Sequence, residues 1–209
     1  MPELLLAYYD VPLESPLKLS SNGHLDLIIP KTTGGHKPYV IGASLNTQYE
    51  AESIHFHWGS AETLGSEHEI DNKRFDIEMH IVHRNMRYPD MNEAKKHPDG
   101  LAVLAIMYMF GRPNAITRTV NPKFFRGSGP RLNELFPKLK ANNFFTYNGS
   151  LTSGNCEESV TWIVFAQELT MTKLLTSIFS SIQDSNGGHL KPNYRQIQPL
   201  NNRTVFYRP

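Results

Sequence analysis

The sequence predicts one mainly β domain with peripheral helices, an α+β fold. Three observations support this prediction. The 209 residues suffice for one well-buried domain but not for two. Short runs of alternating β-branched and aromatic residues, bounded by Gly, Asn and Asp, recur along the chain. Apolar residues with helical spacing occur in few places. Sheet is therefore expected to form the core.

The expected strands follow one another through the middle of the chain. Alternating residues between 39 and 58, and again from 75 to 83, predict strands with two different faces. Continuous apolar runs at Leu101–Phe110 and Val160–Phe165 predict strands that are buried on both faces. These segments together predict the sheet core.

Helices and loops are expected at the edges. Apolar residues on one face predict a helix over 170–182, and a shorter helix is expected over 92–96. The segment 111–137 is rich in Pro and Gly and is expected to be a long loop.

The composition excludes several classes of partner. With 21 basic and 20 acidic residues, the net charge of +1 offers no general attraction to nucleic acid or to a membrane surface. No run approaches the roughly 20 apolar residues of a transmembrane helix. We therefore expect a soluble chain whose partner is neither nucleic acid nor a membrane; a monomer is assumed, and the resemblance described below implies a small-molecule substrate.

Histidines are concentrated in one part of the chain. Five of the nine lie between His55 and His83. Because side chains alternate along a strand, His55 and His57 share one face, and His80 can join them if the two strands pair. Glu78 lies on the same face as His80. Three imidazoles with an open fourth position form the typical ligand set of a catalytic zinc ion.

Two other interpretations stay open at this point. A single strand histidine is more often a buried residue that hydrogen-bonds to the backbone. A cupin-like site is also possible, in which His55, His57 and Glu62 would bind iron or manganese.

Longer motifs are more specific than this spacing. The string IHFHWGSAETLGSEHEIDNKRFDIEMHIVHRN at Ile54–Asn85 resembles the zinc-binding segment of the α-class carbonic anhydrases. Further similar segments follow the family's order across nearly the whole chain: SNGH at Ser21–His24, HPDGLAVLAI at His97–Ile106, FTYNGSLTS at Phe145–Ser153, VTWIVF at Val160–Phe165 and NYRQIQPLNNR at Asn193–Arg203. The resemblance implies a large, mostly antiparallel, twisted central sheet.

The resemblance also implies roles for individual residues. Its zinc ligands would be His55, His57 and His80, with one ion per chain. Glu78 would orient His80, and the backbone carbonyl of Asn193 would orient His57. Thr152 would be the family's gatekeeper threonine. Glu67 would be the buried glutamate to which the Thr152 hydroxyl donates its hydrogen.

The implied reaction is the reversible hydration of carbon dioxide to bicarbonate and a proton by zinc-bound hydroxide, and it would serve pH regulation. Zinc lowers the pKa of its bound water to about 7, so hydroxide exists at neutral pH. His24 would carry the proton to solvent. The apolar wall for CO2 would consist of Val82, Val103, Leu151, Val160 and Trp162. The alternative functions are a binding or adhesion module without turnover and a catalytically impaired fragment.

The sequence departs from the family pattern in several places. Ser53 replaces the glutamine that usually fixes the first ligand, and Gly154-Asn155 replaces a diproline. Met1 aligns inside the family domain, so we expect an N-terminally truncated member. In extracellular relatives the missing segment carries a cysteine whose partner is at the position of Cys156. Together with the sequons at Asn148 and Asn202, this suggests a secreted parent, and a cytoplasmic protein is the alternative.

Overall fold

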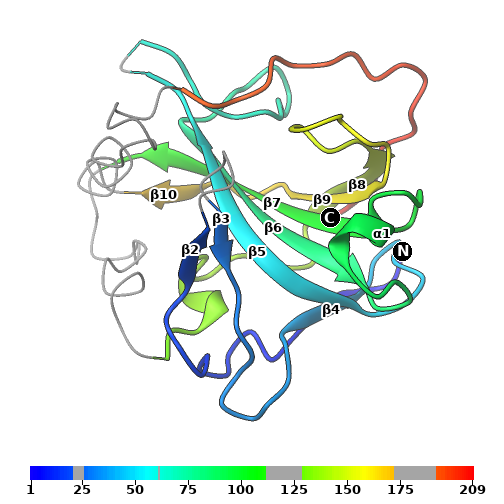
Figure 1. Cartoon of the computed structure of the whole chain (residues 1–209). Coiled ribbons are helices and arrows are strands. Elements are labelled where there is room, and N and C mark those ends of the chain that lie inside the picture. The colour runs from blue at the N-terminus through cyan, green and yellow to red at the C-terminus, as the bar shows by residue number, and fades with distance from the viewer. Residues whose placement is uncertain (21–25, 61, 112–128, 172–191) are drawn as a thin grey trace.

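The computed structural model describes residues 1–20, 26–60, 62–111, 129–171 and 192–209. Strands dominate these residues, as Figure 1 shows, together with one short α-helix, α1 (Met91–Ala94), and one 3-10 turn, η2 (Leu132–Glu134). The strands are β1 (Leu4–Ala7), β2 (Lys18–Ser20), β3 (Asp26–Ile28), β4 (Tyr39–Gly42), β5 (Tyr49–Trp58), β6 (Ile77–Asn85), β7 (Leu101–Phe110), β8 (Phe144–Gly149), β9 (Val160–Phe165), β10 (Leu169–Met171) and β11 (Phe206–Arg208).

The strands form one curled sheet in the order β1-β4-β5-β6-β7-β9-β8-β11. Strand β3 joins it through β5, β2 joins through β3, and β10 pairs with β7. Most neighbours are antiparallel, but β7 runs parallel to both β9 and β10. The predicted fold class, a mostly antiparallel and twisted sheet in a mainly β fold, is confirmed.

The central strands agree closely with the predicted ones. Strands β7 and β9 have the predicted bounds, and nearly all of their side chains are buried, as continuous apolar runs predict. Strand β6 begins two residues later than expected and continues to Asn85. The short helix begins at Met91, where the Asp90 side chain accepts a hydrogen bond from the Glu93 N–H at 2.9 Å.

Other expected elements differ or lie outside the described residues. The predicted helix over 170–182 is wrong at its start, because Thr170 and Met171 pair with β7 as part of β10. Its remainder lies outside the described residues, as does most of the expected loop 111–137. The part of that loop that is described contains η2, which buries Leu132 in the core. In the described ranges, no helix has the length and apolar character needed to cross a bilayer.

The two long strands β5 and β6 separate two differently built faces. Their antiparallel pairing places Ile54 opposite Ile81 and Phe56 opposite Met79, and these side chains belong to the larger apolar core. The alternate residues lie on the other face, as the period of two requires. Val82 there packs in a second apolar cluster with residues of β7 and β9. The histidines lie on this second face.

Candidate metal centre

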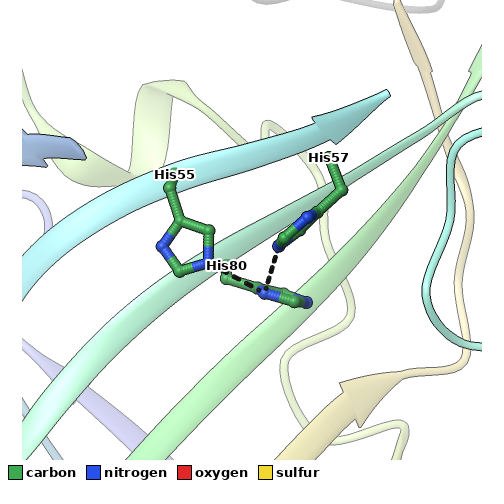
Figure 2. Close-up of side chains that lie close together, drawn as sticks. All are labelled: His55, His57 and His80. Carbon is green, nitrogen blue, oxygen red and sulfur yellow. Dashed lines mark hydrogen bonds between the residues drawn. The ribbon is translucent and has the colours of Figure 1, made fainter. Parts of the chain in front are cut away.

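Two paired strands bring the three predicted histidines together. Strand β5 carries His55 and His57, and β6 carries His80 directly opposite His55 in the register. Glu78 is opposite His57. Residues opposite one another or two apart on neighbouring antiparallel strands share a face. The three rings therefore point toward one another, as Figure 2 shows.

The ring nitrogens that face inward lie close together. His80 Nδ1 is 3.1 Å from His55 Nε2 and 3.0 Å from His57 Nε2. His57 and His80 are buried, whereas the His55 side chain is about one fifth exposed, at 21%. One nitrogen of each ring lies within 4.8 Å of the others. Zinc–nitrogen bonds of about 2.0–2.1 Å separate two ligands of a tetrahedron by roughly 3.3 Å, close to these distances.

The nitrogens that face outward determine which atoms carry protons. His57 Nδ1 lies 3.0 Å from the carbonyl oxygen of Asn193, and His80 Nε2 lies 2.6 Å from Glu78 Oε1. Both oxygens only accept, so these nitrogens must donate their N–H. The inward nitrogens then present lone pairs to each other at 3.0 Å with no proton between them. A cation removes this repulsion, so the donor set fits a metal ion.

Glu78 is the centre of a buried hydrogen-bond network. Its Oε2 accepts from the backbone N–H groups of Glu67 and His68, both at 2.8 Å. Its Oε1 faces His68 Nδ1 and His80 Nε2, each at 2.6 Å. Burial alone would raise the pKa of Glu78, but the two facing imidazoles lower it well below its usual range. Glu78 is therefore an ionised carboxylate that holds the His80 ring.

His68 extends this network and was not predicted as a site residue. Its Nδ1 donates to Glu78, and its Nε2 lies 2.7 Å from the Tyr147 hydroxyl. Burial lowers the pKa of His68, but Glu78 outweighs this effect and leaves the pKa raised. A second group of potential ligands, His68, Glu78 and His80, results. The sequence feature that could have identified His68 as a site residue is its position directly after Glu67 in the Gly-Ser-Glu-His motif.

Glu67 and Thr152 come from two loops, and Glu67 lies beside His57. Glu67 Oε1 accepts the Arg195 backbone N–H at 2.6 Å and lies 3.2 Å from His57 Nδ1. Burial raises the pKa of Glu67, and the Thr152 hydroxyl is among the groups that lower it in part. Within the described residues, Glu67 Oε2 is buried and makes no hydrogen bond of full geometry. The Thr152 hydroxyl is thus close enough to affect the Glu67 carboxylate. It does not form a hydrogen bond of good geometry with Glu67 Oε2.

The five predicted apolar wall residues gather on the same face as the histidines. Val82 pairs with Val103 in the register of β6 and β7, and Val103 pairs with Trp162 in that of β7 and β9. The Trp162 ring centroid lies 4.8 Å from that of His80. All five belong to one apolar cluster or pack against it, namely Val82, Val103, Leu151, Val160 and Trp162.

The remaining predicted residues lie elsewhere. Glu62 is exposed, and its N–H donates to Ser60 Oγ at 3.1 Å. It is not part of either ligand group found among the described residues, so the cupin-like set is not assembled. His24 lies outside the described residues. Cys156 is a partly exposed free thiol with a left-handed φ of 54°, and it gives no direct evidence for a cellular compartment.

Comparison with known proteins identifies the family of the chain. The family model for eukaryotic-type carbonic anhydrase matches residues 1–209. Carbonic anhydrase 6 of dog (Canis lupus familiaris) is 36% identical over 200 residues, which are 88% of this chain and 60% of that protein. Human carbonic anhydrase 7 is 34% identical over 202 residues, 90% of this chain and 76% of that protein.

A nematode relative extends the same result. The putative carbonic anhydrase 3 of Caenorhabditis elegans is 31% identical over 208 residues, 95% of this chain and 79% of that protein. The chain thus spans between three fifths and four fifths of the length of these relatives. Because the family model matches the full sequence, the chain belongs to the eukaryotic-type carbonic anhydrase family.

Proposed function

We propose that residues 1–209 form one carbonic anhydrase-like domain that binds a single zinc ion and reversibly hydrates carbon dioxide to bicarbonate and a proton. The observation that carries this proposal is the convergence of three imidazole nitrogens, two of which, His57 Nε2 and His80 Nδ1, have their lone pairs directed inward. His55 and His57 would bind through Nε2, and His80 through Nδ1. Zinc held there would lower the pKa of a bound water to about 7 and so supply hydroxide at neutral pH.

The protein's own groups would then orient the reaction. Arg195 N–H holds Glu67 Oε1, which leaves the buried Oε2 as an acceptor near Thr152. A threonine hydroxyl that donates its hydrogen to this carboxylate can only accept a hydrogen bond from any other group. Thr152 would therefore fix the direction of the attacking oxygen, a preorganised contact of the kind that lowers barriers.

The apolar wall suits the substrate in this proposal. Carbon dioxide is small and has no net charge, so it favours a surface without hydrogen-bonding groups. Val82, Val103 and Trp162 offer such a surface next to the His80 ring. We also propose that His24 transfers the product proton to solvent, since its reference pKa of about 6.5 suits that step.

The test combines zinc analysis with stopped-flow CO2 hydration of the zinc-loaded chain. We expect one zinc per chain and measurable turnover. Thr152→Ala should keep the zinc and lower the rate by about 10²–10³-fold, the usual cost of one preorganised contact. Thr161→Ala is the matched control, because the Thr161 hydroxyl bonds to Asn148 on β8. Zinc binding without any turnover would instead support a binding module.

A secreted form of the protein is part of this proposal. Asn148 and Asn202, the acceptors of the two sequons, are exposed, so an oligosaccharide transferase could reach both. Expression behind a secretion signal should yield a chain whose mobility changes after enzymatic deglycosylation. An unchanged mobility would favour the cytoplasmic alternative.

A further inference from the structure

His55 differs from the other two histidines in the partner of its outward nitrogen. His57 Nδ1 faces the Asn193 carbonyl, and His80 Nε2 faces Glu78. The residue two positions before His55 is Ser53, whose short side chain cannot span the roughly 6.6 Å that separates alternate residues of a strand. A different group must therefore hold the His55 ring.

The pairing of β3 with β5 brings a carboxylate to this ring. Leu27 is opposite Ile54 and Ile28 is opposite Ser53, so the next step of the same antiparallel register places Asp26 beside His55. Directly opposite residues share a face of the sheet. Asp26 Oδ1 lies 3.5 Å from His55 Nδ1, whereas His55 Nε2 faces His80.

From this arrangement, which rests on the proposed zinc site, we propose that Asp26 is the positioning residue of His55. Its carboxylate accepts a hydrogen bond from Nδ1–H, fixes the tautomer that leaves the Nε2 lone pair for the metal, and holds the ring plane toward His57 and His80. Asp26 thus supplies from the neighbouring strand the acceptor that the short side chain of Ser53 cannot supply from β5, and a longer amide side chain at position 53 could supply the same acceptor.

The expected size of the effect follows from the geometry. Removal of a partner that orients a metal-bound histidine typically lowers metal affinity 10–100-fold. The Asp26 side chain is 33% exposed, and 3.5 Å is longer than a strong charge-assisted hydrogen bond. Solvent screens such a contact, so we expect the lower end of this range, about tenfold.

The experiment measures zinc affinity by competition with a chromogenic chelator. Asp26→Ala should weaken zinc binding about tenfold and speed zinc loss to the chelator. Asp26→Asn keeps an acceptor oxygen and should lose less. The double variant Asp26→Ala with Ser53→Gln should recover most of the affinity. Asp10→Ala, which removes an exposed carboxylate of the N-terminal segment, is the charge-matched control and should leave the affinity unchanged.

A spectroscopic readout separates positioning from general destabilisation. The visible absorption of the cobalt-substituted protein reports the ligand geometry, so it should change in Asp26→Ala and return in the double variant. Equal affinities for Asp26→Ala and Asp10→Ala, or no recovery with Ser53→Gln, would overturn this inference while leaving the zinc site intact. A wild-type chain that binds no zinc would overturn the proposed function as well.

Discussion

His80 and His83 lie three residues apart on the same strand, and both are buried, yet they face opposite sides of the sheet. His83 has one partner for each nitrogen. Its Nε2 lies 2.5 Å from the Tyr9 hydroxyl, and its Nδ1 donates to the Ala102 carbonyl at 3.2 Å. For His80, Nε2 faces the acceptor oxygen of Glu78, whereas Nδ1 faces two further ring nitrogens.

The difference shows what separates a core histidine from a metal ligand. Burial lowers the pKa of both residues, so burial alone does not distinguish them. His83 satisfies both nitrogens within the protein and needs nothing further. His80 has its outward nitrogen held by an anion and its inward nitrogen aimed at other lone pairs. Only this second arrangement calls for a cation.

The largest expected effect is the loss of zinc-dependent stability when His80 is replaced by alanine. With zinc at 1,000 times its dissociation constant, binding to the folded state alone stabilises a protein by about 4 kcal/mol. Chelation should therefore lower the melting temperature of the wild-type chain and of His83→Gln, whose amide keeps both a donor and an acceptor for the groups that His83 contacts, Tyr9 and Ala102. His80→Ala should show no response to chelation. Calorimetry with and without chelator measures these melting temperatures. If His80→Ala still responds to chelation, His80 is not a metal ligand and does not differ from His83 in the way described.

The second effect is a pH dependence of the unfolding free energy that is caused by His83. Burial lowers the pKa of His83 to about 4, against 6.5 in the unfolded chain. Between these values the unfolded state binds more protons than the folded state, so stability falls as the pH falls from 6.5 to 4. The shift corresponds to at most about 3 kcal/mol.

Denaturant unfolding of the zinc-free wild type and of His83→Gln across this pH range isolates the effect, since other groups titrate in both proteins. The difference in unfolding free energy between the two should shrink with falling pH and level off below about pH 4. A constant difference would mean that His83 is not held neutral in the fold.

The smallest of the three effects is the loss of metal affinity when the Glu78 carboxylate, which faces His80 Nε2, loses its charge. Glu78→Gln keeps the size of the side chain but removes the charge that faces His68 and His80. Metal affinity should fall about 10–100-fold, which is about 1.4–2.8 kcal/mol. Asn85→Asp on the same strand tests whether any change of a buried polar group has this result. Equal zinc affinities of Glu78→Gln and wild type would show that the ring needs no anionic partner.

The sequence allowed the centre of the sheet to be predicted but not its periphery. Strands β5, β6, β7 and β9 carry long alternating or continuous apolar runs, and these patterns follow from burial on one face or on both. Strands β1, β2, β3, β10 and β11 have three or four residues each, too few for a period to be recognised. Such strands form because a neighbouring strand offers them hydrogen bonds.

The site shows the same division between local and long-range information. His55, His57 and His80 could be grouped because two neighbouring strands with a period of two place them on one face. The contact of Asp26 with His55 depends on the register of a three-residue strand, and that of His68 with Glu78 depends on the return of the loop after β5. Arg195 N–H reaches Glu67 across 128 residues of sequence. No local pattern reports such contacts.

X-ray absorption of the zinc-loaded protein tests the central claim most directly, because it counts and identifies the atoms bound to the metal. We expect three nitrogen ligands at about 2.0–2.1 Å and one oxygen, with no sulfur. In His80→Ala the nitrogen count should fall or the zinc should be lost. A shell with sulfur from Cys156, a shell rich in carboxylate oxygens, or a purified chain that holds iron or manganese in place of zinc would contradict the account.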